Sequence, residues 1–98
     1  MRVQWSRRAT TDLQQLAEFL REQSTEREAA ITTQLITSSQ QLAAQPRLGQ
    51  RREVPEETGE IRTLLVSKTY RLVYEIIDEE RVIILQVLDV RRNNTFYR

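Results

Sequence analysis

The sequence has 98 residues, 15 of them basic and 14 acidic, with a formal net charge of +1. A chain of this length fits one domain, and we expect residues 1–98 to form it. Cysteine and histidine are both absent, which excludes disulfides, thiolate chemistry and metal sites built on those side chains. The small net charge argues against a protein that coats nucleic-acid backbones without sequence preference.

No targeting or membrane segment is predicted. The first residues, MRVQWSRRATTDLQQ, lack an apolar stretch and a small-residue cleavage site, and no run approaches the roughly 20 apolar residues of a membrane span. The sequence also has no glycine-rich phosphate loop and no metal-ligating constellation. We therefore expect a soluble cytoplasmic protein without membrane association, cofactor or metal.

The N-terminal segment predicts a short strand followed by a helix. In RVQWS, residues 2–6, Val3 and Trp5 alternate with Gln4, which is the period of a strand. Apolar residues then recur at three- and four-residue steps over residues 9–20, with charged residues on the opposite side, as in an amphipathic helix. We expect Trp5 to anchor the strand against the helical layer.

Two helix N-termini can be placed by their capping residues. Thr10 or Thr11 can cap the first helix, and residues 25–28, TERE, fit a capping box that starts a second one. Helical spacing of apolar residues continues over residues 29–43, and Pro46 cannot extend the helix. The short connection predicts an antiparallel helical hairpin.

The second half of the chain predicts a sheet. Residues 46–60 contain both prolines and both glycines and are predicted to form a loop. Three strand-like runs follow at residues 61–66, 70–77 and 82–88, separated by short polar turns. The order strand, helix, helix, strand, strand, strand predicts an α+β fold, in which the N-terminal helical hairpin packs on one face of an antiparallel sheet.

Several arginines fall in or beside these strands. Arg71 interrupts the most apolar run, YRLVYEII, and Arg62 lies in the run before it. The two arginines would share the helix-free face if the hairpin register brings them together. Arg91 and Arg92 follow the last run, and Tyr97 lies six residues beyond Arg91. One hypothesis is that these side chains converge on a concave sheet surface.

A simpler interpretation of the strand arginines is structural. Charged residues on a solvated sheet face usually form cross-strand ion pairs, so Arg62 and Arg71 could pair with Glu75 or Asp89. The sequence pattern does not decide between this interpretation and a binding or catalytic surface.

Four segments resemble the ParE/RelE superfamily of bacterial type II toxin–antitoxin toxins, and together they extend over nearly the whole chain. The resemblance implies the strand, helical hairpin and three-stranded meander that the periodicity also predicts. The segments are VQWSRRATTDLQQLAEFL, LAAQPRLGQRREVPE, EIRTLLVSKTYRLVYEI and VIILQVLDVRR.

The resemblance implies two alternative activities. RelE-like members are ribosome-dependent mRNA endoribonucleases that use basic residues and a C-terminal tyrosine on the sheet face. In that case Arg71 matches the strand arginine, Arg62 stands in place of a lysine, Arg91 or Arg92 matches the arginine after the last strand, and Tyr97 matches the catalytic tyrosine. ParE-like members are not known nucleases; they bind DNA gyrase and block replication.

The departures from the RelE pattern favour the ParE branch. Leu64 occupies the position of a second lysine, histidine is missing, and the charge of Asp89 would oppose a phosphate. The PRLGQRREVPE segment and the long second helix also look more like ParE members. The preferred expectation is therefore a gyrase inhibitor without catalytic residues, in which the four arginines and the tyrosine are antitoxin- or target-facing candidates.

The resemblance also implies partners. Such toxins are held inactive in a hetero-oligomer with an antitoxin whose flexible segment folds on the toxin surface. The expected target is DNA gyrase, whose inhibition would stop growth, and the alternative target is mRNA on the ribosome. A third interpretation, a nontoxic binding module or decayed toxin, predicts that expression leaves growth unaffected.

Overall fold

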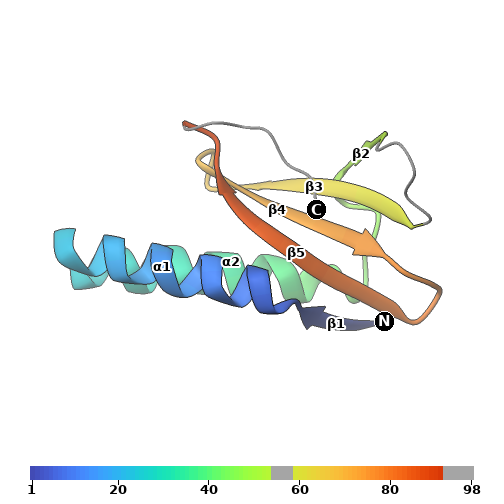
Figure 1. Cartoon of the computed structure of the whole chain (residues 1–98), viewed down its shortest axis with the longest axis horizontal. Helices are drawn as coiled ribbons and strands as arrows, with labels where there is room; N and C mark the ends of the chain where they lie inside the picture. Colours follow the sequence, from blue (N-terminus) through green and yellow to red (C-terminus); the bar gives the residue numbers. More distant parts are fainter. Residues whose placement is uncertain (54–58, 92–98) are drawn as a thin grey trace.

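The structure is a computed structural model that describes residues 1–53 and 59–91. The elements follow each other along the chain as two layers, one of helices and one of strands (Figure 1). They are β1 (Arg2–Trp5), α1 (Arg7–Gln23), α2 (Thr25–Gln41), β2 (Gln50–Arg52), β3 (Glu60–Val66), β4 (Tyr70–Ile76) and β5 (Arg81–Asp89).

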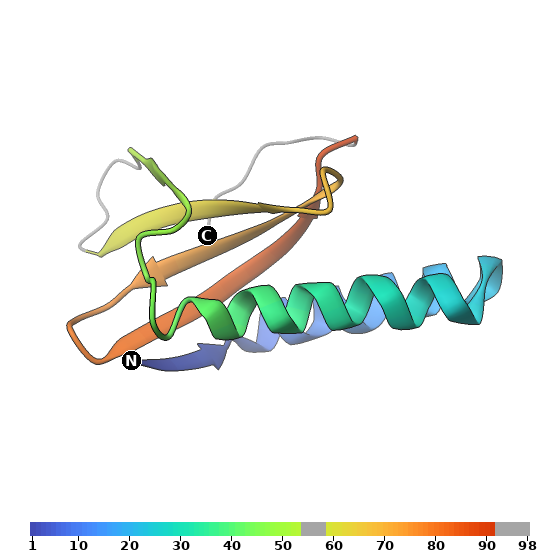
Figure 2. The same cartoon turned by 180° about the vertical axis from the view of Figure 1, so that it is seen from behind.

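The described strands form one sheet in the order β1-β5-β4-β3-β2, and both helices lie side by side on one of its faces (Figures 1 and 2). The predicted α+β class and the helical hairpin are confirmed. Two details differ from the prediction. The sheet is mixed, because β1 runs parallel to β5, and the predicted loop contains β2, which pairs with β3.

The parallel direction of β1 follows from long-range pairing. The amide of Arg2 donates to Glu80 O at 2.7 Å, and the amide of Ser6 donates to Ile84 O at 2.9 Å. These bonds tie the start of the chain to the start of β5, which lies at the far end of the sequence. Alternation within RVQWS predicts a strand but carries no information about its partner or direction.

Each helix begins earlier than its predicted cap. Ser6 caps α1, since its Oγ accepts a hydrogen bond from Ala9 N at 3.0 Å. Ser24 caps α2 in the same way, with Arg27 N as the donor at 3.1 Å. The predicted caps Thr10 and Thr11 lie inside α1, because β1 already ends at Trp5 and the hydroxyl that follows it is free to cap.

The core lies between the helices and one face of the sheet. Tyr70, Leu72 and Tyr74 of β4 are almost fully buried there, together with Leu35 of α2 and Leu42, the residue that caps the C-terminus of α2. Burial of this apolar area is the main stabilising contribution to the fold. The indole N–H of Trp5 donates to Ser39 Oγ at 3.3 Å, which joins β1 to α2, as the sequence predicts.

A β-bulge changes the side-chain alternation of β5. Val73 of β4 lies opposite Gln86, whereas the next residue, Tyr74, lies opposite Ile84, so Leu85 has no partner in the ladder. Core-facing residues of β5 are therefore even-numbered before the bulge and odd-numbered after it.

Within the described ranges, neither helix combines the length and the apolar character needed to cross a membrane.

Candidate functional site

The two strand arginines lie on opposite faces of the sheet. Arg62 pairs across the β3–β4 ladder with Tyr74, a core residue, whereas Arg71 pairs with Leu65. Directly opposed residues of an antiparallel ladder point to the same face, so Arg62 is on the helix side and Arg71 on the helix-free side. The predicted shared face is wrong because three residues, 67–69, connect the strands and pair even-numbered positions with even-numbered ones.

Arg62 has a structural environment. Its Nε donates to Glu60 Oε2 at 2.5 Å, and its NH1 donates to two backbone carbonyls, Gly49 O at 2.6 Å and Arg47 O at 3.3 Å. Its side chain is only 15% exposed. The predicted pairing with Glu75 or Asp89 is therefore wrong for Arg62. Its guanidinium instead links residues 47–49, which follow α2, to β3.

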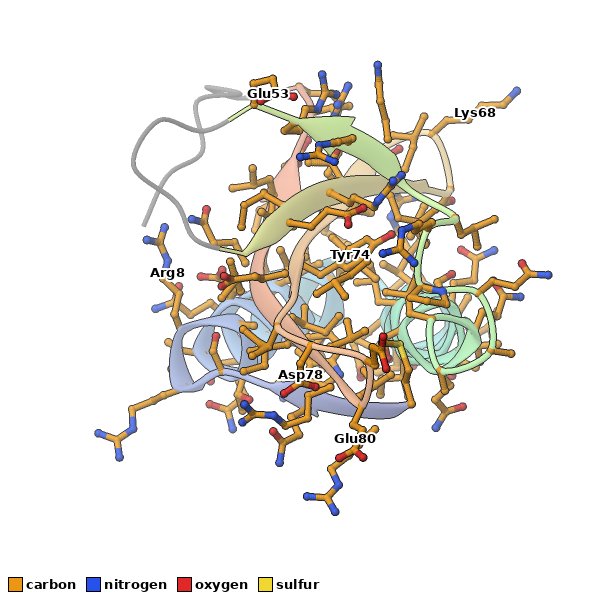
Figure 3. All side chains as sticks on the ribbon, turned by 90° about the vertical axis from the view of Figure 1, so that its right-hand side faces the viewer. Arg8, Glu53, Lys68, Tyr74, Asp78 and Glu80 are labelled. Atoms are coloured by element: carbon orange, nitrogen blue, oxygen red, sulfur yellow. The ribbon has the colours of Figure 1, made fainter. Side chains whose placement is uncertain are left out.

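Tyr74 holds the same segment from the neighbouring strand. Its hydroxyl accepts from Gly49 N at 2.9 Å and donates to Pro46 O at 2.7 Å. Figure 3 shows Tyr74 inside the fold, whereas Lys68 extends outward. Burial raises the pKa of Tyr74. We call this contact of Tyr74 and Arg62 with residues 46–49 the latch.

Glu60 and Gly49 complete the latch. Burial disfavours ionisation of Glu60, but the guanidinium groups of Arg62 and Arg47 outweigh it and lower the pKa of the carboxyl group. A Cβ on Gly49 would lie 2.6 Å from Thr63 O and 2.8 Å from the Tyr74 hydroxyl. Only glycine fits at this close approach of loop and sheet.

Arg71 differs from Arg62 in its contacts. It is half-buried on the helix-free face, between Leu65 of β3 and Leu88 of β5 in the cross-strand row. Its Nε is buried and has no hydrogen-bond partner in the structure. The role of Arg71 as a target- or antitoxin-facing side chain stays a prediction.

Arg91 is held by an acidic neighbour. Its guanidinium donates to both oxygens of Asp89, at 3.1 and 3.0 Å, and its backbone N–H donates to Asp89 Oδ1 at 2.9 Å. Asp89 raises the pKa of Arg91. Asp89 lies opposite Tyr70 on the helix side of the sheet. The ion pair therefore holds the Arg91 guanidinium beside a helix-side residue, whereas Arg71 is on the helix-free side.

The other two candidates, Arg92 and Tyr97, lie outside the described residues. Among the candidates that are described, Arg62, Arg71 and Arg91 do not converge on one surface. The described part of the chain also has no group of three or more acidic side chains that could hold a metal ion.

The helix-free face has a second arginine that the sequence pattern missed. Arg52 of β2 lies opposite Ile61, an odd-numbered residue of β3, and its Nε donates to Thr63 Oγ1 at 3.1 Å. It therefore shares the face of Arg71. Two adjacent arginines, Arg51 and Arg52, must point to opposite faces if they belong to a strand, but the surrounding prolines and glycines indicated a loop.

Comparison with known proteins gives one family and one fold. Residues 3–94 match the family model of the ParE toxin of the type II toxin–antitoxin system parDE. A similar solved structure is that of the chromosomal ParDE toxin–antitoxin system from P. aeruginosa, with a TM-score of 0.74 and 19% identity over 91% of this chain and 95% of that one. No curated protein sequence matches this chain. The family match extends over nearly the whole sequence, and the chain belongs to the ParE toxin family of type II toxin–antitoxin systems.

Proposed function

We propose that this ParE toxin inhibits DNA gyrase by binding it, and that it acts in the cytoplasm without cutting RNA. The proposal has two parts, the absence of nuclease chemistry and the identity of the target. The first part is argued from the geometry of the arginines. The second is argued from membership of the ParE family, whose members resemble this chain in the linker and second helix.

One observation carries the first part: Arg62 and Arg71 lie on opposite faces of the sheet. Cleavage of RNA through its 2′-hydroxyl needs cations that converge on one phosphate to stabilise the developing charge. Arg62 instead donates to Glu60 and to two backbone carbonyls, and Arg91 is bound to Asp89. These two arginines cannot serve a phosphate beside Arg71 without breaking those contacts.

Inhibition by binding makes smaller demands on the site. Binding requires an exposed, complementary surface, but it does not require a proton donor or acceptor beside the ligand. Arg71 and Arg52 on the helix-free face supply guanidinium groups suited to carboxylates of a protein partner. We place the gyrase contact on this face, with growth arrest as its consequence.

Neutralisation by a cognate antitoxin is the second element of the proposal. The antitoxin is expected to form a hetero-oligomer with the toxin and to order on its surface, as flexible inhibitory segments do. Co-expression with the antitoxin should restore growth. Unchanged growth arrest in its presence would count against this element.

Two assays on one preparation test the target. Purified toxin should inhibit supercoiling of relaxed plasmid by gyrase, or trap cleaved DNA with gyrase, and should leave mRNA intact on translating ribosomes. Codon-linked cuts in mRNA that Arg71→Ala abolishes would refute the proposal and show that the protein is a ribonuclease. Normal growth on expression without antitoxin would indicate a nontoxic binding module.

A further inference from the structure

An open hollow lies between α1 and the C-terminal half of β5, away from the latch. Its volume is about 340 Å³, at the lower end of the range for sites that bind small molecules. Phe19 at its rim is 40% exposed. We call it the α1–β5 hollow and define it by Asp12, Leu16, Phe19, Tyr70, Val87 and Asp89.

The hollow exists because β1 is short. The β1 strand pairs only with residues 81–84 of β5, so no described strand lies beside the outer edge of β5 beyond Ile84. Side chains of the α1 region replace the missing strand: Ser6 Oγ donates to Leu85 O at 3.2 Å, and Asp12 Oδ2 accepts from Val87 N at 3.0 Å. The Asp12 carboxylate is thereby fixed at the wall of the hollow.

Two acceptors in the hollow have unused capacity. Tyr70 is 1% exposed, and its hydroxyl has no hydrogen-bond partner in the structure. Both contacts of Asp12, with Val87 N and with Arg8 Nε at 3.9 Å, use Oδ2, so Oδ1 can still accept. Arg8 is too distant for a hydrogen bond, and its side chain is largely exposed.

The residues around these acceptors restrict the ligand. A carboxylate oxygen beside a hydroxyl favours a cation with several N–H donors, and the side chains of Leu16, Phe19 and Val87 favour an aliphatic stem. Arginine has both parts, and its planar fork can reach two acceptors at once, which a lysine ammonium does less well. Asp89, at the same hollow, already binds a guanidinium in this way, that of Arg91.

We propose that the α1–β5 hollow binds one arginine side chain of the antitoxin, with the guanidinium between Asp12 Oδ1 and the Tyr70 hydroxyl and the stem along Leu16 and Val87. This inference rests on the proposed neutralisation by an antitoxin. If the antitoxin also covers Arg52 and Arg71, on the face proposed to contact gyrase, it must be acidic there and basic at this hollow. The two charges together would fix the direction in which its segment crosses the toxin.

The test measures the affinity of the purified toxin for the antitoxin encoded beside it. Asp12→Asn keeps an acceptor for Val87 N but removes the charge, and Tyr70→Phe removes only the hydroxyl. Each variant should weaken binding by about tenfold or more, as expected for a buried hydrogen bond to a charged group. Asp78→Asn, in the exposed β4–β5 turn (Figure 3), is the matched control and should bind like the wild type.

Alanine substitution of each antitoxin arginine, alone and together with the toxin variants, completes a double-mutant cycle. One substitution should weaken binding by a similar factor and cause no further loss when combined with Asp12→Asn. Wild-type affinity in both toxin variants, or losses that add for every antitoxin arginine, would overturn the inference and leave neutralisation intact. Failure of the wild-type toxin to bind the antitoxin would refute the proposed neutralisation itself. If Asp12→Asn does not fold, Tyr70→Phe decides the outcome.

Discussion

Removing the Tyr74 hydroxyl is expected to destabilise the protein strongly, although a single oxygen atom is lost. In Tyr74→Phe the buried amide of Gly49 loses its acceptor, which costs about 1–3 kcal/mol. The lost bond to Pro46 O adds about 0.5–1.5 kcal/mol. We therefore expect the free energy of unfolding to fall by about 2.5 kcal/mol, and the melting temperature of a chain of this size to fall by roughly 10–20 °C.

Tyr70→Phe is the matched control for this prediction. Both tyrosines lie in β4, on the same face, and both are almost fully buried, but the Tyr70 hydroxyl has no partner to lose. Its removal should change the free energy of unfolding by less than about 0.5 kcal/mol or stabilise the protein slightly. Urea denaturation followed by circular dichroism measures both variants. Equal losses in the two variants would refute the assignment of the latch.

The remaining predictions concern the latch and the two strand arginines. Gly49→Ala should lower the free energy of unfolding by about 2 kcal/mol or more, measured by urea denaturation, because the new methyl group would meet the backbone of Thr63. In the same assay Arg62→Ala should cost about 1.5–3 kcal/mol and Arg71→Ala less than about 1 kcal/mol, since Arg62 loses hydrogen bonds to Glu60 and Gly49, whereas the Nε of Arg71 has no partner among the described residues. The raised pKa of Tyr74 predicts that its contribution to stability is complete below the unfolded-state pKa of about 10.0 and is lost as the pH rises further; in a pH series of melting temperatures, the wild type should therefore lose stability above pH 10 more steeply than Tyr74→Phe.

Sequence periodicity predicted the elements whose signal is local. The 3.6-residue spacing of α1 and α2 and the apolar runs of β3, β4 and β5 are properties of each segment alone, and the segments folded as expected. Helix starts were misplaced because several hydroxyl residues, Ser6 and Ser24 among them, can cap equally well in sequence. The end of β1 at Trp5 decides which hydroxyl caps α1, and that depends on pairing with β5.

The site was harder to predict because it depends on register. Whether Arg62 and Arg71 share a face changes with a single residue in the connecting turn, and the sequence does not give the turn geometry. That turn places Ser67 and Lys68 at positive φ, a conformation that the sequence SKT does not indicate. The bulge at Leu85 similarly moves Asp89, and with it Arg91, to the helix side.

The latch was missed for a related reason. The sequence predicts Tyr74 only as a member of an alternating strand and Arg62 as a candidate site residue, whereas their partners are backbone groups of residues 46–49, 13 to 28 residues earlier in the chain. Such hydrogen bonds cannot be predicted from the composition of the partner segment, because its backbone groups do not depend on residue type. The one available signal was Gly49, which stands where a side chain cannot fit.

The proposed function of this ParE toxin is inhibition of gyrase without nuclease chemistry. The decisive measurement is plasmid supercoiling by purified gyrase at rising toxin concentration, with and without an equimolar amount of the antitoxin. We expect supercoiling to fall as toxin is added and to recover when the antitoxin is present. Undiminished supercoiling at every toxin concentration, from a preparation that still arrests growth, would contradict it.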